Sequence, residues 1–340
     1  MRRSPSALSM LLLRHTNRRY FMAALGGAAA WPLITHAQDM PQVAMLYPGP
    51  ADAAAARAKI VWQGLNDRGY VEGKNLGLVS RAFDFNPDLM AKFSAELAEA
   101  RNVRAILAVG PAAVRAEQAA TTTTPIVALD LETDPVSTGL IASLAHPAGN
   151  LTGLFFDFPE FSSKWLQLLQ EAIPRLSRVA MVWDPTTGPV QVNAAETAAA
   201  GQGLHLQIIE VREPAALENA FAAAEREQAQ GVVVLSSPLF SAVIGAPKVA
   251  ELAAWHRLPA VSLFPEFAQF GGLMGYGPRI TDIYRQAGAL LGRVLHGEKP
   301  ADLPIERPTR LYLVINLKTA KTLGLTLPPT LVARADEVIE

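Results

Sequence analysis

Polar and small residues follow the ends of several short apolar runs, and these are the positions in the chain best suited to chemistry. Asp130, Glu132 and Asp134 cluster after one such run, and Ser236 and Ser237 follow another. The acidic cluster lacks the number of oxygen ligands and the turn glycine that a calcium loop needs. A polar loop at the end of a strand explains the cluster better than a metal site, so we expect no metal there.

Motifs that carry catalysis or bind phosphate are absent from the sequence. It contains no GxSxG, no HExxH, no GxxxxGK[ST] and no strand-linked GxGxxG. The four histidines after residue 37 do not lie at metal-ligand spacing from one another. We therefore expect no catalytic residue, no bound metal and no cofactor, and we do not expect an enzyme.

The positions beyond the strand ends suit the binding of a small molecule, because parallel α/β sheets bind ligands beyond the carboxyl ends of their strands. Backbone N–H groups at a helix start suit a carboxylate, serine hydroxyls donate hydrogen bonds, aromatic rings form walls, and acids hold an ammonium group. The candidate ligand-binding residues are Tyr47, Gly49, Gly110, Pro111, Ala112, Asp130, Asp134, Phe156, Asp184, Thr187, Ser236, Ser237, Phe264, Glu266 and Tyr276. Turns at strand ends need Gly, Pro, Ser and Asp in any case. Only the convergence of two groups of strand ends on one cleft favours binding.

Apolar runs alternate with helical patterns along most of the chain, which predicts parallel sheets with helices on both faces. Strands are predicted at 42–47, 76–83, 105–109, 126–129 and 151–156, and then at 179–183, 204–211, 232–235 and 260–263. Asn86-Pro87-Asp88 is a typical helix start, and further helices are predicted at 160–173, 190–201, 213–230 and 241–256. Two successive series of strands indicate an α/β protein with two similar lobes.

The composition excludes several classes of protein. Half of the 340 residues are hydrophobic, 18% are charged and none is cysteine. This apolar content is too high for a disordered chain, and the lack of cysteine excludes a disulfide scaffold, a thiolate metal site and a lipid anchor on a mature terminus. Lys and Arg total 30 against 31 Asp and Glu, so binding of nucleic acid through a broad basic surface is not expected.

The first 37 residues have the pattern of an export signal. They contain five arginines and no acid, and a weakly apolar run at 20–31 is followed by Pro32 and by Thr35-His36-Ala37. This order of basic, apolar and A-x-A-like segments predicts export to the periplasm with cleavage near Ala37. Arg18-Arg19 before Tyr20 resembles a twin-arginine signal, and a general-secretion signal remains the alternative. No later apolar run reaches membrane length, so no membrane insertion is expected after processing.

Several motifs together resemble the ABC-transporter substrate-binding protein family whose better-known members bind tryptophan or tyrosine. Asp134-Pro135 with the run from Gly139 to Gly153 is similar to the central signature of that family, and the run from Gly271 to Pro278 is similar to its late one. Further similarity lies in the export segment and at 63–75, 297–304 and 314–320. Asp184 to Pro189 replaces an Asn-rich stretch that is common in the family, and this departure bears on the identity of the ligand.

The resemblance implies the periplasmic binding protein type I fold, in which two Rossmann-like lobes with parallel sheets flanked by helices are joined by a hinge that the chain crosses three times. We expect these crossings near Phe156, Gly277 and Pro304. The expected division is therefore an export signal at 1–37, a first lobe at 42–156 plus 277–304, and a second lobe at 157–276 plus 305–340.

The resemblance also implies a function. A periplasmic protein of this family would capture a small solute, such as an amino acid, an aromatic acid or a small organic acid, in the cleft between its lobes. It would deliver the solute to a permease of the inner membrane that works with a cytoplasmic ATPase. Two alternatives remain open on the sequence: a ligand-sensing domain that feeds a membrane receptor, and a secreted α/β hydrolase using Ser236, Ser237 and His256.

Overall fold

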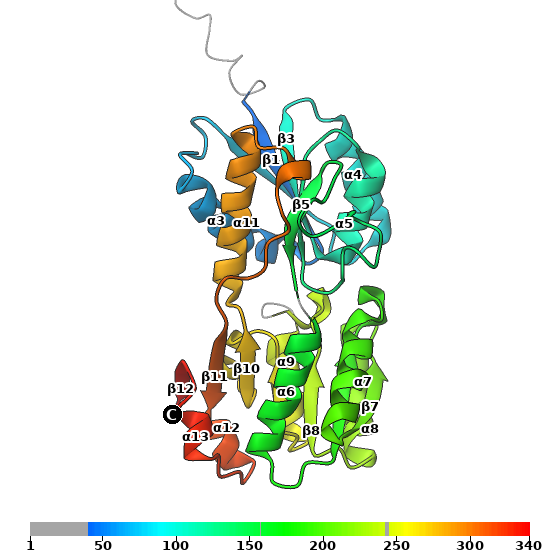
Figure 1. Cartoon of the computed structure of the whole chain (residues 1–340), viewed down its shortest axis with the longest axis vertical. Helices are drawn as coiled ribbons and strands as arrows, with labels where there is room; N and C mark the ends of the chain where they lie inside the picture. Colours follow the sequence, from blue (N-terminus) through cyan, green and yellow to red (C-terminus); the bar gives the residue numbers. More distant parts are fainter. Residues whose placement is uncertain (1–39, 157, 242–244) are drawn as a thin grey trace, which may run out of the picture. The chain divides into compact units, whose positions relative to one another are not determined.

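The apolar runs of the first half of the chain form a five-stranded parallel sheet in the order β2-β1-β3-β4-β5 (Figure 1). Its strands are β1 (Gln42–Tyr47), β2 (Gly77–Ala82), β3 (Val103–Val109), β4 (Ile126–Asp130) and β5 (Leu151–Phe155). Strands β1 and β3 to β5 are almost wholly buried, as near-continuous apolar sequence requires in a sheet covered on both faces. All five predicted strands of this series are confirmed to within two residues at each end.

Four helices cover the first sheet, two on each face. They are α3 (Ala51–Asn66), α4 (Pro87–Glu99), α5 (Gly110–Ala120) and α11 (Ile280–Leu295). Val61 of α3 and Leu291 of α11 pack in one cluster with Met45 of β1, whereas Val114 of α5 packs in another cluster with Leu46. The predicted start of α4 is confirmed, because the Asn86 side chain accepts hydrogen bonds from the N–H groups of the first turn.

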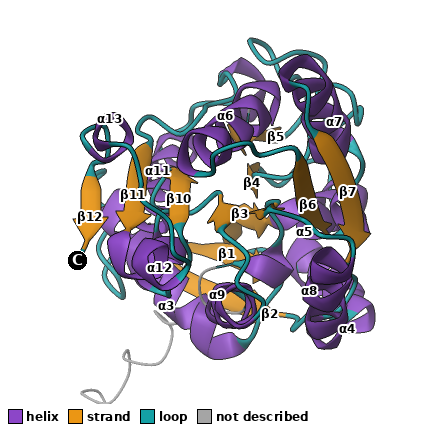
Figure 2. Cartoon of the chain, turned by 90° about the horizontal axis from the view of Figure 1, so that it is seen from below, coloured by secondary structure: helices purple, strands orange, loops and turns teal. Residues whose placement is uncertain are grey.

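The second sheet has seven strands in the order β12-β11-β10-β9-β8-β6-β7, and Figure 2 shows β12 and β7 at its two edges. The strands are β6 (Arg178–Trp183), β7 (His205–Glu210), β8 (Gly231–Val234), β9 (Ala260–Ser262), β10 (Met274–Gly277), β11 (Tyr312–Asn316) and β12 (Glu337–Ile339). The pairing is parallel except between β10 and β11, which are antiparallel. The prediction of parallel sheets flanked by helices is confirmed, and the antiparallel pair is the one exception among the described strands. Strand β11 is reached by a long return from the first lobe instead of a helical crossover.

Helices lie on both faces of the second sheet. They are α6 (Phe158–Ala172), α7 (Val190–Gln202), α8 (Leu217–Arg226), α9 (Ala246–Trp255), α10 (Glu266–Gln269), α12 (Leu317–Thr322) and α13 (Pro329–Val332). Figure 2 shows α6 and α7 on one side of β6 and β7, and α8 and α9 on the other. The predicted helices at 160–173 and 190–201 match α6 and α7. The helices predicted at 213–230 and 241–256 contain the shorter α8 and α9, and α8 starts only after the turn at Pro214–Ala216.

Three connections join the elements of the two sheets. The chain leaves the first sheet after β5, returns to it from β10 into α11, and leaves again before β11. The last connection touches the first sheet on its way, since the Glu306 carbonyl accepts a hydrogen bond of 3.0 Å from the Phe155 N–H. Residues 41–340 form one compact unit.

The structure is a computed structural model and describes residues 40–156, 158–241 and 245–340. The export signal predicted at 1–37 lies outside these residues, so its twin-arginine pattern and its cleavage near Ala37 stay predictions. Within the described part of the chain, no helix has the length and apolar character needed to span a bilayer.

Candidate ligand-binding cleft

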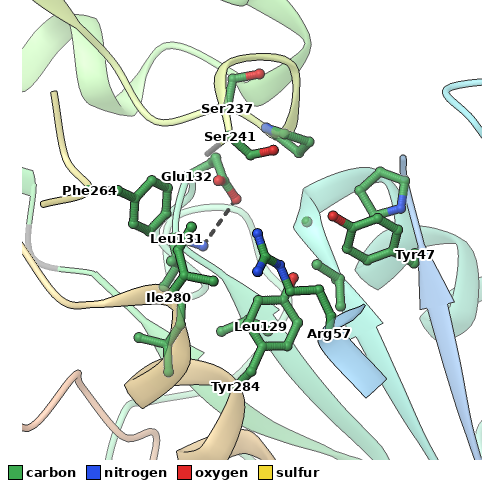
Figure 3. A pocket seen from close by; sticks show the side chains of 15 residues that line it. Tyr47, Arg57, Leu129, Leu131, Glu132, Ser237, Ser241, Phe264, Ile280 and Tyr284 are labelled. Carbon is green, nitrogen blue, oxygen red and sulfur yellow. Dashed lines mark hydrogen bonds between the residues drawn. The ribbon is translucent and has the colours of Figure 1, made fainter. Parts of the chain in front are cut away.

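A cavity of about 50 Å³ lies where carboxyl ends of strands from both sheets approach one another (Figure 3). The first sheet and its helices supply Tyr47 after β1, Gly110 after β3, Glu132 after β4, Arg57 from α3 and Tyr284 from α11. The second sheet supplies Ser237, Pro238, Ser241 and Phe264, which follow β8 and β9. The remaining lining residues are Pro48, Val109, Leu129, Leu131, Ile280 and Ile283.

A second cavity of about 280 Å³ adjoins the first, and Pro48, Val109, Gly110 and Pro238 line both. It lies at the N-terminus of α5, where no side chain caps the helix. Gly110 has a φ of +80°, which glycine adopts without strain, and a Cβ atom there would lie 3.2 Å from Pro238. The uncapped N–H groups and the helix dipole make this end of the cavity suitable for an anion.

The acids after β4 form a buried, hydrogen-bonded loop. Asp130 accepts hydrogen bonds of 3.0 Å from the N–H groups of Glu132 and Thr133, and one of 2.6 Å from the Thr133 hydroxyl. Burial raises the pKa of both carboxyls, and it raises that of Glu132 well above its ordinary value because the neighbouring Asp130 also disfavours a second negative charge. The three donors favour the negative charge on Asp130, so of the two carboxyls Glu132 is the one more readily protonated.

Glu132 also links the loops of the two sheets. Its Oε1 accepts a hydrogen bond of 2.9 Å from the hydroxyl of Ser236, the residue that follows Leu235 at the end of β8. The loop that carries Ser236 is held firmly, since the Gln191 side chain accepts from the Ser236 N–H and donates to its carbonyl, both at 2.8 Å. Ser237 in turn donates a hydrogen bond of 2.6 Å to Asp184.

The predicted binding residues separate into four groups in the structure. Tyr47, Gly110, Ser237 and Phe264 line the first cavity, and Gly110, Pro111, Ala112, Asp184 and Thr187 line the second. Asp134 and Phe156 line a different cavity, of about 620 Å³, with residues of α7. Gly49, Asp130, Ser236, Glu266 and Tyr276 line neither of the first two cavities.

The three acids that were expected to hold the ammonium group of a ligand make other contacts in the structure. Asp130 is fully buried and bonded to its own loop, and Glu266 accepts a hydrogen bond of 3.0 Å from the Ile280 N–H. Asp134 accepts hydrogen bonds from the N–H groups of Val136 and Ser137 in its own turn. None of these three carboxylates points into the first cavity, because each stabilises local backbone instead.

Sequence reasoning missed Arg57, Glu132 and Tyr284 as lining residues. Arg57 lies on α3 and Tyr284 lies on α11, two helices that are far apart in the sequence. Neither residue follows the end of a strand, so the search of strand ends could not identify them. Their side chains meet because the two helices pack together, and the guanidinium lies 5.4 Å from the centre of the Tyr284 ring. The only signal in the sequence was an arginine on the otherwise apolar side of a helix, together with Val61 and Leu65.

The side chains suggested for a hydrolase are not arranged as a catalytic site. His256 Nδ1 lies 2.6 Å from Glu225 Oε2 on the surface, whereas Ser236 and Ser237 are bonded to Glu132 and Asp184. Among the described residues, no histidine contacts either serine, and no group of three or more His, Asp or Glu side chains is arranged to hold a metal ion.

The sequence is similar to a known protein family and to a known binding protein. A family model described as ABC transporter substrate binding protein matches residues 17–339. A tyrosine-binding protein of Clostridioides difficile is 23% identical over 265 residues, which are 77% of this chain and 74% of that protein.

Two solved structures are similar in fold. One is a conserved domain protein from Vibrio cholerae, with a TM-score of 0.80 and 24% identity, covering 88% of this chain and 99% of that one. The other is an ABC domain from Streptococcus pneumonia in complex with L-Trp, with a TM-score of 0.80 and 20% identity, covering 88% and 100%. These likenesses confirm the predicted fold of two α/β lobes.

Proposed function

Because the chain belongs to the ABC transporter substrate-binding protein family, we propose that it captures a small solute between its two lobes and delivers it to an ABC importer. The matches are to binding proteins, which agrees with the expectation that the chain is not an enzyme. The observation that carries the proposal is the cavity lined from both sheets, with Tyr47 and Glu132 on one side and Ser237 and Phe264 on the other.

The proposed mechanism is closure of the lobes around the solute. The lobes would be residues 42–156 plus 277–304 and residues 157–276 plus 305–340, and the three connections between them would absorb the rotation. Contacts to a solute from both sides favour the closed form over the open one. The hydrogen bond from Ser236 to Glu132 joins the two sides and would add to that preference.

The relatives suggest which solutes to test first. One similar protein is named for tyrosine, and one similar structure holds L-Trp. A solute with a carboxylate also suits the uncapped N-terminus of α5, beside Gly110, Pro111 and Ala112. We therefore propose an amino acid, an aromatic acid or another small organic acid as the solute.

The proposed location of the protein is the periplasm. The arginine-rich segment before Ala37 would direct export, and the mature protein would carry a net charge of about −6 once five arginines are removed. Its partners would be a permease of the inner membrane and the cytoplasmic ATPase of that importer.

Mass spectrometry of small molecules released from the purified, denatured protein tests the proposal. We expect one solute to be enriched, and calorimetry of the refolded protein with that solute to show binding. Small-angle scattering should then show a smaller radius of gyration on saturation. Release of no small molecule, together with no compaction in any amino acid, aromatic acid or small organic acid, would contradict the proposal.

Replacing Ser236 with alanine is expected to weaken solute affinity about fivefold to tenfold. The substitution removes the hydroxyl that donates to Glu132, and one net hydrogen bond contributes about 1 kcal/mol to the closed form. Calorimetry measures the affinity, and scattering at saturating solute should still show full compaction. Ser143→Ala is the matched control, because that hydroxyl bonds only within its own turn, to His146. An affinity of Ser236→Ala within twofold of the wild type would show that the bond does not favour closure.

A further inference from the structure

Arg57 is a buried cation in the wall of the first cavity. Its side chain comes from α3, the residue is only 8% exposed, and Figure 3 shows the guanidinium directed toward the middle of the cavity. Among the described residues, no ion pair joins this guanidinium to a carboxylate, whereas Arg279 and Arg285 are paired with Glu337 and Asp67. A buried charge is costly unless an opposite charge and hydrogen bonds compensate it.

Two tyrosines lie beside the Arg57 guanidinium. The guanidinium lies 5.4 Å from the centre of the Tyr284 ring. Burial raises the pKa of Tyr47 and that of Tyr284, and the nearby positive charge of Arg57 offsets part of each rise. Because burial raises both values above the ordinary value for tyrosine, neither phenol ionises at neutral pH. These rings fix the direction of the guanidinium without neutralising its charge.

The other ionisable group that lines the cavity does not compensate Arg57. Both oxygens of Glu132 already accept hydrogen bonds, from Ser236 and from the Leu131 N–H, and burial beside Asp130 raises the pKa of this carboxyl well above its ordinary value. Glu266 also lies nearby. Burial raises its pKa, and hydrogen bonds from backbone N–H groups together with the positive charges of Arg279 and Arg57 offset part of this rise. It does not line the cavity, and its Oε1 is occupied by the Ile280 N–H.

Besides Arg57 and Glu132, the lining has no charged side chain, so only neutral hydroxyls such as that of Ser241 could face an ammonium group. The apolar side chains are those of Val109, Leu129, Leu131, Phe264, Ile280 and Ile283. The uncapped N-terminus of α5 adds partial positive charge at the border with the second cavity. The cavity thus has two sources of positive potential and no exposed carboxylate with a free oxygen.

We propose that the solute is a monoanion, a carboxylate with an apolar body and no ammonium group, and that Arg57 binds its negative charge. The inference rests on the proposed function and narrows it, since it separates organic acids from amino acids of the same shape. Arg57 then sets specificity: a zwitterion would bring its ammonium group into a cavity whose wall carries the Arg57 cation, and the repulsion would cost affinity.

Matched pairs of compounds test the inference by calorimetry on protein refolded from denaturant to remove any bound solute. The pairs are 3-(4-hydroxyphenyl)propionate with tyrosine, indole-3-propionate with tryptophan, and 4-methylpentanoate with leucine. Each pair differs only by the amino group. We expect the acid of the best pair to bind at least about tenfold more tightly than its amino acid.

Variants of Arg57 test whether the residue binds the charge of the solute. Arg57→Gln is expected to weaken binding of the acid about 100-fold, the usual effect of losing a charge-assisted hydrogen bond, and Arg57→Lys to restore part of the loss. Lys59→Gln is the matched control, because it removes an exposed cation from the same helix, and it should leave affinity within twofold. The primary amide of the same acid separates recognition from structure: Arg57→Gln should weaken binding of the acid far more than binding of the amide.

These experiments distinguish a failure of the monoanion proposal from a failure of the proposed function. An amino acid that binds as tightly as its matched acid, or an equal loss for acid and amide in Arg57→Gln, overturns the inference and leaves the proposed function in place. Binding of none of the six compounds also overturns the inference. The release experiment above then decides separately whether the protein binds a small solute.

Discussion

Replacing Gly64 with alanine is expected to lower the free energy of unfolding by about 3 kcal/mol, because the new methyl group has no room. Helices α3 and α11 meet at Gly64 and Gly288. A Cβ atom at Gly64 would lie 2.6 Å from the Ala289 nitrogen and closer still to the Arg285 carbonyl oxygen. Since these neighbours are backbone atoms, the helices themselves must move apart. Urea denaturation measures the loss, which should also lower the melting temperature by roughly 5 to 10 °C.

Gly201→Ala provides the matched control for this substitution. Gly201 is also helical, in α7, but a Cβ atom there meets nothing within 4 Å. Alanine at that position is expected to raise stability by about 0.5 to 1 kcal/mol, because glycine is the poorer helix former. If Gly64→Ala proved as stable as the wild type, the close approach of α3 and α11 would be wrong.

Glu117→Gln is expected to stabilise the protein by about 2 to 3 kcal/mol at pH 8 and to have little effect at pH 5. Glu117 lies on α5 with no exposure to solvent, and neither of its carboxyl oxygens has a hydrogen-bond partner among the described residues. Burial raises its pKa from 4.5 to about 7, and the Ser94 hydroxyl, which does not reach hydrogen-bonding geometry, opposes part of the rise. This shift corresponds to about 3 kcal/mol between the two protonation states.

The sign of the pH dependence follows from proton uptake. The folded protein keeps a proton on Glu117 up to about pH 7, whereas the unfolded chain loses it near 4.5. The contribution of Glu117 to the free energy of unfolding is therefore fully present below pH 4.5 and is lost as the pH rises through 7. Urea denaturation of both proteins at pH 5, 6, 7 and 8 measures the difference.

A matched control for Glu117 is available on α4. Glu99 is an exposed acid, and Glu99→Gln should leave the dependence of stability on pH unchanged. Glu117→Met should remove the dependence as Glu117→Gln does, since it also carries no ionisable group. A dependence between pH 5 and 8 that is the same in the wild type and in Glu117→Gln would refute the assignment.

The sequence predicted the elements whose signals are local. Strands β1 to β9 were found because each is a short apolar run bounded by turn residues, and α4 because Asn86, Pro87 and Asp88 form a cap. The strand ends that reach the cleft, at Tyr47, Gly110 and Ser237, were found for the same reason.

The remaining features depend on contacts between distant segments. Strands β11 and β12 were not predicted from their pattern, because both are short and form only after the chain has returned from the first lobe, where β11 pairs with β10 and β12 with β11. Arg57 was missed since an arginine on a helix usually reaches solvent. Its burial requires α11, whose Tyr284 lies over 200 residues away in the sequence.

Helix α11 also constrains the order in which the protein can acquire its packing during synthesis. It covers the same face of the first sheet as α3, and Val61 and Leu65 of α3 share a core cluster with Ile283 and Leu291 of α11. A nascent chain that ends before residue 280 leaves that face of α3 open to water and to other chains. Because this contact closes a long loop, the first lobe should complete its folding late and slowly. Prematurely terminated products are therefore expected to aggregate through α3, even though all five strands of their first sheet are present.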